Sequence, residues 1–377
     1  MNKVLRSMVH LLIDTTVAGG LVAAMAGVYQ IERTGSPPAD PGAGRGDLAV
    51  EIKGVGDDSK PKGKTMRLAL TPPAYDDMGK LLDTLGEGYA YETVALDDLK
   101  NPDALSRYDI LFVTCRDSLK NEITLQQGLR AFVDRGGTLY ASDHWYTVVA
   151  SAFLEFVDPA SPPSGDKQVV NARVLDPSLQ ALFGPEVSLN FDLAPWRPAA
   201  FRGERVAVLL EGDYQTQKNT TATAPLLVKF PVGKGTVIFT SFHNAKLQGE
   251  TALKLLRSLV FIAATAEVES QIKTTMVTRG FDPKRQNLLS VSTGDPSFTE
   301  TYLSTKGGRL QFALGISDPG ARFRLKVVAP DGRKAEHASN TSFSLVVTDA
   351  QVGKWAYTLT AESLPYPNFP YTLTIGE

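Results

Sequence analysis

GGTLYASDHW, residues 136–145, begins with a glycine turn, continues as a short apolar strand and ends in Ser-Asp-His-Trp. GKGTVIFTSFHN, residues 233–244, repeats this order and ends in Phe-His-Asn. A helical pattern comes after each stretch. Ligands of open α/β sheets bind just outside the carboxyl ends of the strands. Because two of the four histidines stand at such ends, these stretches predict both an α/β sheet and the place of a site on it.

Strands and helices alternate between residues 66 and 265. The apolar run YDILFVT, residues 108–114, is typical of a strand buried on both faces. Apolar residues at helical spacing predict a helix over 123–135 that ends at the glycine pair. We expect further strands at 66–71, 89–96, 138–142, 168–174, 206–211, 224–230 and 236–242, and further helices at 76–85, 146–156 and 245–264. This alternation predicts a doubly wound, mostly parallel α/β sheet.

After residue 267 the helical pattern gives way to alternating segments that are separated by turn signals such as Asp-Pro-Gly. This spacing predicts an antiparallel, all-β sandwich of about 100 residues. The aromatic residues between 355 and 371 are expected to pack in its core and at its edge. The alternative is an exposed face that binds carbohydrate or protein, because exposed aromatic side chains are good anchors.

The N-terminal residues differ from the rest of the chain. A mostly apolar run over 8–29 is just long enough to cross a bilayer as a helix, and its basic flank favours export of the downstream residues. The triplet 24–26, Ala-Met-Ala, also has the form of a signal-peptidase site. The expected organisation is a signal peptide or transmembrane anchor at 1–33, a flexible linker at 34–65, an α/β domain at 66–267 and a β-sandwich domain at 268–377.

Composition excludes several classes of protein. Apolar residues make up 43% and charged residues 21% of the 377 residues, which is ordinary for globular domains. A formal net charge of −2 gives no general attraction to nucleic acid. Cys115 is the only cysteine, which excludes an intramolecular disulfide and a cysteine-rich metal site.

Residues 66–265 resemble the class I glutamine-amidotransferase-like superfamily, most of all its ThuA-like branch. The resemblance is carried by YDILFVT, AFVDRGGTLYASDHW and GKGTVIFTSFHN. It implies a flavodoxin-like fold, a nucleophile elbow after the strand 138–142, and His243 as general base. Residues 353–371 resemble the closing strands of bacterial extracytoplasmic β-sandwich modules, such as pre-peptidase C-terminal domains. That second resemblance implies binding or spacing rather than catalysis.

The chain departs from the superfamily's pattern where catalysis would occur. The elbow has neither a cysteine nor flanking glycines, which normally make its strained conformation tolerable. Asp143 or Ser142 stands in the nucleophile's place, whereas Cys115 ends the preceding strand. The glutamate that the resemblance implies beyond His243 is also missing, and Asn244 takes the next position. These departures argue against cysteine-dependent glutaminase activity.

Three interpretations of the site stay open. In a hydrolytic arrangement, Ser142 or Asp143 acts with His243, since a nucleophile needs a base within hydrogen-bond reach. In a metal site, Asp143, His144 and His243 form a two-histidine, one-carboxylate set suited to zinc or iron(II). In the third, these are inherited positions held by hydrogen bonds at the sheet edge. Other residues expected to bind a ligand there are His144, Trp145, Asp192, Trp196, Arg197 and Asn244.

We expect an exported, membrane-tethered protein on the periplasmic side that binds or assembles components of the cell envelope. Its α/β domain would be a catalytically degenerate amidotransferase-like domain without a cofactor, and its partner a protein or a carbohydrate. The alternative is a hydrolase or a metal-dependent, carbohydrate-active enzyme that uses Asp143, His144 and His243.

Overall fold

The computed structural model describes residues 47–55, 66–117, 119–243, 250–291 and 296–377. The expected signal peptide or anchor at 1–33 and most of the expected linker therefore lie outside the described residues. Within the described part of the chain, no helix combines the length and the apolar character needed to cross a membrane.

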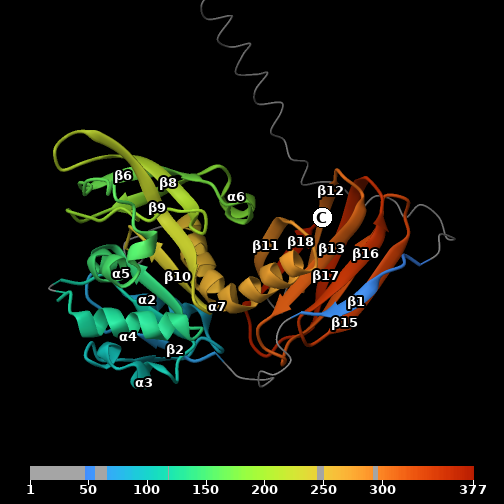
Figure 1. Ribbon diagram of the computed structural model, residues 1–377, viewed down its shortest axis with the longest axis horizontal. Coiled ribbons are helices and arrows are strands. Elements are labelled where there is room, and N and C mark those ends of the chain that lie inside the picture. Colours follow the sequence, from blue (N-terminus) through green and yellow to red (C-terminus); the bar gives the residue numbers. More distant parts are fainter. Residues whose placement is uncertain (1–46, 56–65, 118, 244–249, 292–295) are drawn as a thin grey trace, which may run out of the picture. The chain divides into compact units, whose positions relative to one another are not determined.

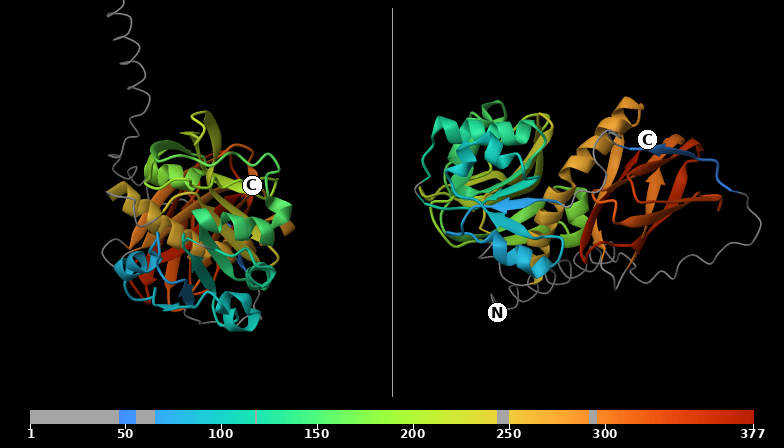
Figure 2. Two further views of the ribbon diagram at one scale, coloured as in Figure 1. Left: turned by 90° about the vertical axis from the view of Figure 1, so that its left-hand side faces the viewer. Right: turned by 90° about the horizontal axis from the view of Figure 1, so that it is seen from below.

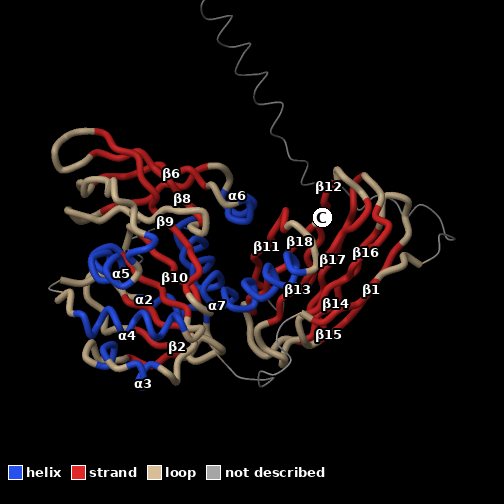
Figure 3. The backbone as a smooth tube through the Cα atoms, in the orientation of Figure 1, coloured by secondary structure: helices blue, strands red, loops and turns tan. Residues whose placement is uncertain are grey.

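A nine-stranded mixed sheet forms the α/β part (Figures 1 and 3). One half is parallel, with strands in the order β3, β2, β4, β5 and β10. The other half continues antiparallel from β10 through β9, β8, β6 and β7. The strands are β2 (Leu68–Leu70), β3 (Tyr91–Thr93), β4 (Ile110–Val113), β5 (Thr138–Ser142), β6 (Gln168–Val174), β7 (Glu186–Phe191), β8 (Ala207–Gln215), β9 (Thr221–Val232) and β10 (Gly235–Thr240).

The prediction of a mostly parallel sheet is therefore correct for one half only. Short connections explain part of the antiparallel half. Gly233 and Lys234 alone separate β9 from β10, and Gly233 has a positive φ of 54°. A two-residue turn can join only antiparallel strands, because a parallel pair needs a long crossover. The expected strands over 108–114, 138–142 and 168–174 are confirmed, and β7 is an additional strand.

Helices cover both faces of the parallel half (Figure 2). One face packs on α3, α4 and α5, and the other packs on α2 and α7. Successive residues of β4 and β5 alternate between these two apolar layers, which explains why both strands read as continuous apolar runs. The helices are α2 (Met78–Leu85), α3 (Pro102–Leu105), α4 (Ile123–Asp134), α5 (Tyr146–Ala152), α6 (Pro177–Phe183) and α7 (Glu250–Thr278), with 3₁₀ turns η1 (Asp98–Lys100), η2 (Asp143–Trp145) and η3 (Leu154–Phe156).

Helix α7 is longer than expected. The sequence predicts a helix over 245–264 and no helical pattern after 267, whereas α7 ends at Thr278. Its last turns carry Val268, Ile272 and Met276 at a spacing of four residues, and all three are buried. Ile272 and Met276 pack on Ala313 and Val346 of the β-sandwich part. The helix therefore continues past the α/β part because a second apolar surface covers it.

Two antiparallel sheets form the β-sandwich part, as expected for an all-β antiparallel fold. The five-stranded sheet has the order β1, β16, β13, β18, β11, and the four-stranded sheet has the order β12, β17, β14, β15. Aromatic rings pack between the two sheets; the ring centroids of Phe312 and Tyr357, for example, are 5.8 Å apart. The strands are β11 (Pro283–Val291), β12 (Ser297–Ser304), β13 (Gly308–Ile316), β14 (Arg322–Val328), β15 (Lys334–Ser339), β16 (Phe343–Ala350), β17 (Gly353–Ser363) and β18 (Phe369–Gly376).

Strand β1 (Glu51–Gly54) precedes the α/β part in the sequence, yet it pairs antiparallel with β16 of the sandwich. This strand takes the place of part of the flexible linker expected over 34–65. Its position is fixed by Leu48, which is buried in the apolar core and whose N–H donates to the carbonyl of Lys334 at 2.8 Å. The α/β part is therefore inserted between β1 and the remaining strands of the sandwich.

Candidate functional site at the carboxyl rim of the sheet

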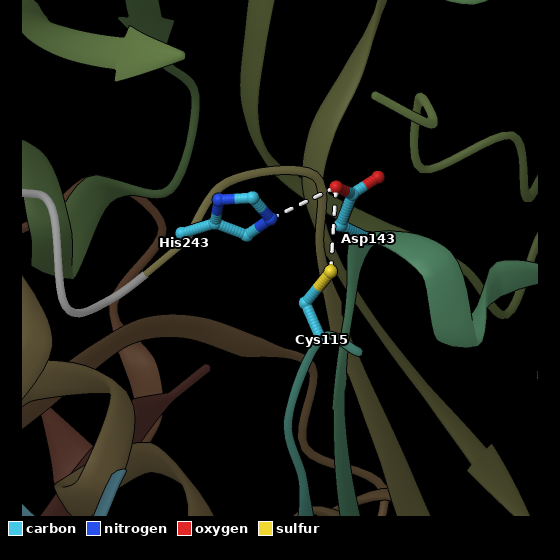
Figure 4. A group of neighbouring side chains, drawn as sticks. All are labelled: Cys115, Asp143 and His243. Carbon is cyan, nitrogen blue, oxygen red and sulfur yellow. Dashed lines mark hydrogen bonds and ion pairs between the residues drawn. The ribbon is translucent and has the colours of Figure 1, made fainter. Parts of the chain in front are cut away.

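Three neighbouring parallel strands deliver their next residues to one rim of the sheet. Ser142, the last residue of β5, pairs with Thr240 of β10, and Ala141 pairs with Val113 of β4. Because the strand ends lie level, the side chains of Cys115, Asp143 and His243 converge just beyond them (Figure 4). The two sequence-distant histidine stretches thus meet at one rim, and a thiol joins them. We call these three residues the rim triad.

Asp143 adopts an uncommon backbone conformation. Its φ is +42°, in the left-handed region that non-glycine residues rarely occupy, and its side chain is 1% exposed. Such a conformation costs about 1–3 kcal/mol and persists only where the surroundings fix it. Here Oδ1 accepts the backbone N–H of Arg197 at 2.6 Å, and Oδ2 accepts His243 Nε2 at 2.9 Å. The carboxylate is therefore held from two sides.

His243 lies between two carboxylates. Its Nε2 bonds Asp143 Oδ2, and its Nδ1 lies 3.3 Å from Asp192 Oδ1. Burial lowers the pKa of His243, but its hydrogen bonds to Asp143 and Asp192, with the charges of Asp143 and Asp76, outweigh burial and raise that pKa. The two carboxylates therefore favour the protonated form of the ring, in which both N–H groups donate.

Cys115 is fully buried, and its Sγ lies 3.6 Å from Asp143 Oδ2. Burial raises the pKa of this thiol well above its usual range, and the negative charge of Asp143 raises it further. Since the thiolate is the nucleophilic form, the protonated thiol is a poor nucleophile. The S–H group instead donates a weak hydrogen bond to the carboxylate.

A second layer of hydrogen bonds lies beneath the rim triad. Ser142 Oγ accepts the backbone N–H of Cys115 at 2.9 Å and donates to Asp76 Oδ2 at 3.1 Å. Asp76 is itself fully buried. These two bonds direct the Ser142 hydroxyl toward Cys115 and Asp76, so that it positions the strand ends.

His144, Trp145 and Tyr75 surround the rim triad in different ways. His144 is partly exposed, and its Nε2 lies 3.1 Å from the Pro195 carbonyl oxygen and 3.8 Å from Asp143 Oδ2. Trp145 is fully buried, and its Nε1–H donates to the carbonyl of Thr114 at 2.8 Å. The centroid of the Tyr75 ring lies 6.3 Å from that of the His144 ring and 6.4 Å from that of the His243 ring.

The loop before residue 198 reaches the site through two of its three expected residues. Asp192 contacts His243 through its carboxylate, and Arg197 contacts Asp143 through its backbone N–H. The Arg197 guanidinium points elsewhere, to Ser164 Oγ at 3.0 Å. Trp196 is buried and stacks on Phe191 with ring centroids 4.0 Å apart, so it packs in the core beneath the loop. Asn244 lies outside the described residues.

Sequence reasoning did not assign Cys115, Asp76 or Tyr75 to the site. Each had a positional signal. Cys115 comes two residues after β4, and Tyr75 and Asp76 come after β2, so all three stand beyond carboxyl ends of the same parallel strands. The neighbouring Asp77 caps α2 instead, because its side chain accepts the N–H of Lys80 at 3.3 Å.

Two surface hollows, of about 270 and 420 Å³, lie elsewhere on the α/β part. Both are lined by Ala90 and Tyr91 at the free edge strand β3, and the first also by residues 66–68 at the start of β2. They lie toward the amino ends of the strands, whereas the rim triad lies beyond the carboxyl ends. We therefore take the rim triad as the candidate site.

Several solved structures are similar to this chain at low identity. A ThuA-like protein from Bacteroides uniformis is 11% identical with a TM-score of 0.39, covering 53% of this chain and 93% of that one. A glutamine amidotransferase from Thermotoga maritima is 8% identical with a TM-score of 0.33, covering 57% and 86%. The exo-β-1,4-mannosidase Op5Man5 from Opitutaceae bacterium strain TAV5 is 12% identical with a TM-score of 0.33, covering 56% and 36%.

No protein-family model and no curated protein matches this sequence.

Proposed function

We propose that this chain is a binding protein of the cell envelope whose α/β part holds a ligand at the rim without cysteine-dependent catalysis. The observation that carries the proposal is Asp143, which stands directly after β5, where the amidotransferase resemblance implies the nucleophilic cysteine. The only thiol is buried beside that carboxylate. The strained, doubly anchored carboxylate supports a retained binding centre, since such strain is expected to persist at functional sites.

The envelope location is part of the proposal and rests on the sequence. The basic residues before the apolar run over 8–29 favour export, and the run is long enough to act as a tether. A protein or carbohydrate of the envelope is the proposed partner. A β-lactamase fused after residue 377 should confer resistance, and the fusion should remain with membranes after an alkaline wash. Recovery of the fusion in the cytosol without resistance would contradict the envelope proposal.

The binding proposal is tested by turnover. The full-length chain is assayed for glutamine hydrolysis and against a panel of chromogenic esters, amides and glycosides, together with Cys115→Ala and Asp143→Asn. We expect that any turnover seen with the wild-type chain is retained in both variants. Glutamine hydrolysis that disappears in Cys115→Ala would show that the buried thiol is catalytic and would refute the proposal.

A hydrolase is the second candidate, and one observation favours it: Asp143, His243 and Asp192 form a connected acid–base–acid chain around a strained carboxylate. Asp143 Oδ2 would attack an alkyl or glycosyl carbon of the substrate and displace the leaving group as an anion, giving an ester on the enzyme. Esterification removes the negative charge of Asp143, so His243 could then lose its proton and activate water to cleave the ester.

This second mechanism predicts a specific intermediate. Replacing His243 with Gln would block hydrolysis of the ester, so the alkyl or glycosyl group would remain on Asp143. Mass spectrometry of the peptide containing residue 143 would detect it. Turnover of any panel substrate, together with such an adduct, would establish the hydrolase in place of the binding protein.

A further inference from the structure

We propose that the rim triad of Cys115, Asp143 and His243 is a binding site for one zinc-class transition-metal ion. The inference deepens the proposed binding function by giving the chemical class of the species that the rim holds. It does not depend on whether the chain also breaks bonds. It also differs from the set expected from the sequence, in which His144 stood in place of Cys115.

The first support is the spacing of the donor atoms. One ligand atom from each residue of the rim triad lies within 4.8 Å of the other two. In a tetrahedral zinc site with bonds of about 2.0–2.3 Å, neighbouring donors are about 3.3–3.6 Å apart. Cys115 Sγ and Asp143 Oδ2 are 3.6 Å apart, which fits. His243 Nε2 and Asp143 Oδ2 are 2.9 Å apart. The ion would displace the protons of the Cys115 thiol and of His243 Nε2 to the solvent, replace this hydrogen bond and widen the N···O separation by about 0.4 Å.

The second support is the chemistry of the donors. A thiol, an imidazole and a carboxylate supply sulfur, nitrogen and oxygen, which together suit zinc, iron or copper. Magnesium and calcium prefer oxygen ligands alone, so the cysteine selects against both. The side chains of all three residues are 5% exposed or less, which removes the competition of bulk water for the donors.

The third support is a set of hydrogen bonds that would fix the ligands in place. Metal-binding histidines commonly donate their second ring N–H to a carboxylate, and Asp192 occupies that position at His243 Nδ1. The Arg197 N–H holds the other oxygen of Asp143, at 2.6 Å. The backbone N–H of Cys115 is fixed by Ser142 Oγ. Each ligand thus stands just after a rigid strand and has a further contact that sets its orientation.

Three protein ligands leave one tetrahedral position for water or a ligand atom. The rings of Tyr75 and His144 lie next to the rim triad and are both partly exposed. This side is therefore the one from which an envelope ligand would reach the ion.

Metal content of the full-length chain tests the proposal. The chain is stripped with a chelator, dialysed against zinc and analysed by atomic emission, and the affinity is measured by competition with a chromophoric chelator. We expect one zinc ion per chain. Cobalt(II) should give a thiolate-to-metal charge-transfer band. Cys115→Ser, which is nearly isosteric, should remove that band and weaken zinc binding at least tenfold, and Asp192→Asn should weaken it about 10- to 100-fold.

Matched variants separate this site from other zinc-binding groups. His337→Gln, in the sandwich, should leave zinc stoichiometry and affinity unchanged, whereas His243→Gln should lower the affinity as Cys115→Ser does. Thermal unfolding of each variant establishes whether it folds. If His243→Gln does not fold, the zinc affinity of Cys115→Ser and the cobalt charge-transfer band test the metal site.

Absence of stoichiometric zinc in the wild-type chain, or unchanged affinity in Cys115→Ser, would overturn the metal site. Equal losses in His144→Gln and His243→Gln would also overturn it, in favour of the two-histidine, one-carboxylate set. Failure of the binding function has a different signature. Zinc-dependent turnover of a panel substrate would refute binding without catalysis and leave the metal site intact.

Discussion

Gly88 shows how a single residue sets a contact between the α/β part and the sandwich. Its φ is +93°, and a Cβ atom built on it would lie 2.3 Å from Cγ of Tyr366. The neighbouring Tyr89 donates from its hydroxyl to the carbonyl of Asn368 at 2.7 Å. A side chain at residue 88 would therefore force apart a contact between two segments that are distant in the sequence.

We predict that Gly88→Ala lowers the free energy of unfolding by about 2–3 kcal/mol, because it adds overpacking to the strain of a positive φ. Gly86 is the matched control. It has a φ of +80°, but nothing lies within 4 Å of the position that a Cβ atom would take there. Gly86→Ala should therefore carry the backbone strain alone and cost about 1 kcal/mol. Denaturant unfolding measures both; equal losses in the two variants would show that the contact with Tyr366 does not matter.

At the same scale, the sequence predicts part of the site for a clear reason. Asp143 and His243 come after apolar strands of matching pattern, so their convergence could be expected from the rule for carboxyl ends. Cys115 also follows a parallel strand, but its contact with Asp143 could not be predicted, because that contact depends on β4 being the neighbour of β5. The contact of Asp192 with His243 depends on the path of a loop that carries no periodic pattern.

At the scale of elements, helix α7 is attached to the α/β sheet by a buried charge cluster. Glu269 on α7 is 4% exposed and accepts both Lys229 Nζ of β9, at 2.8 Å, and Lys273 Nζ, at 2.6 Å. Burial alone would raise the pKa of Glu269, but the two lysines outweigh it and lower that pKa from 4.5 to about 2.

The direction of this shift predicts a pH dependence. Because the pKa is lower in the folded chain, the cluster stabilises the fold above the unfolded-state pKa near 4.5 and loses this effect as the pH falls toward 2. Glu269→Gln should cost about 3 kcal/mol at pH 7, since it leaves lysines without their partner. The difference from wild type should shrink between pH 5 and pH 3, as measured by urea unfolding.

Glu267→Gln, on the same helix, is the control and should show a much smaller loss at pH 7. A loss in Glu269→Gln that stays constant from pH 7 to pH 3 would contradict the assignment of the low pKa to this cluster.

The sequence also predicts which helices and strands exist better than it predicts the residues at which they end. The strand over 138–142 has the expected bounds because it is buried on both faces and bordered by a glycine pair. Helix α7 was expected to end before its last turns. Those turns bury Ile272 and Met276 against a sheet whose position could not be known from local pattern. Tertiary contact here extends a helix beyond its predicted end.

At the scale of the whole chain, the order of elements ties the two folded parts together. The sandwich takes β1 from before the α/β part and its other strands from after it. Helix α7 packs against β5 and β10 of one part and against β11, β13 and β18 of the other. Because a single helix contributes to both cores, neither part can lose its packing without exposing apolar surface of that helix.

We therefore predict that the two parts unfold in one transition. Trp145 and Trp196 report on the α/β part, and Trp355 reports on the sandwich; all three are buried. In Trp355→Phe, fluorescence monitors the α/β part alone, and in the double variant Trp145→Phe, Trp196→Phe it monitors the sandwich alone. Within each protein, the fluorescence and far-ultraviolet circular dichroism midpoints should coincide, as two-state unfolding requires.

A substitution at Leu48, just before β1, gives a second test of this coupling. Leu48 is 5% exposed, so Leu48→Ala should cost about 2 kcal/mol, whereas Ile52→Ala, at a side chain 52% exposed, should cost far less. If unfolding is coupled, Leu48→Ala lowers the midpoint reported by Trp145 and Trp196, although residue 48 belongs to the sandwich. A lower midpoint for Trp355 alone would mean that α7 does not couple the two parts.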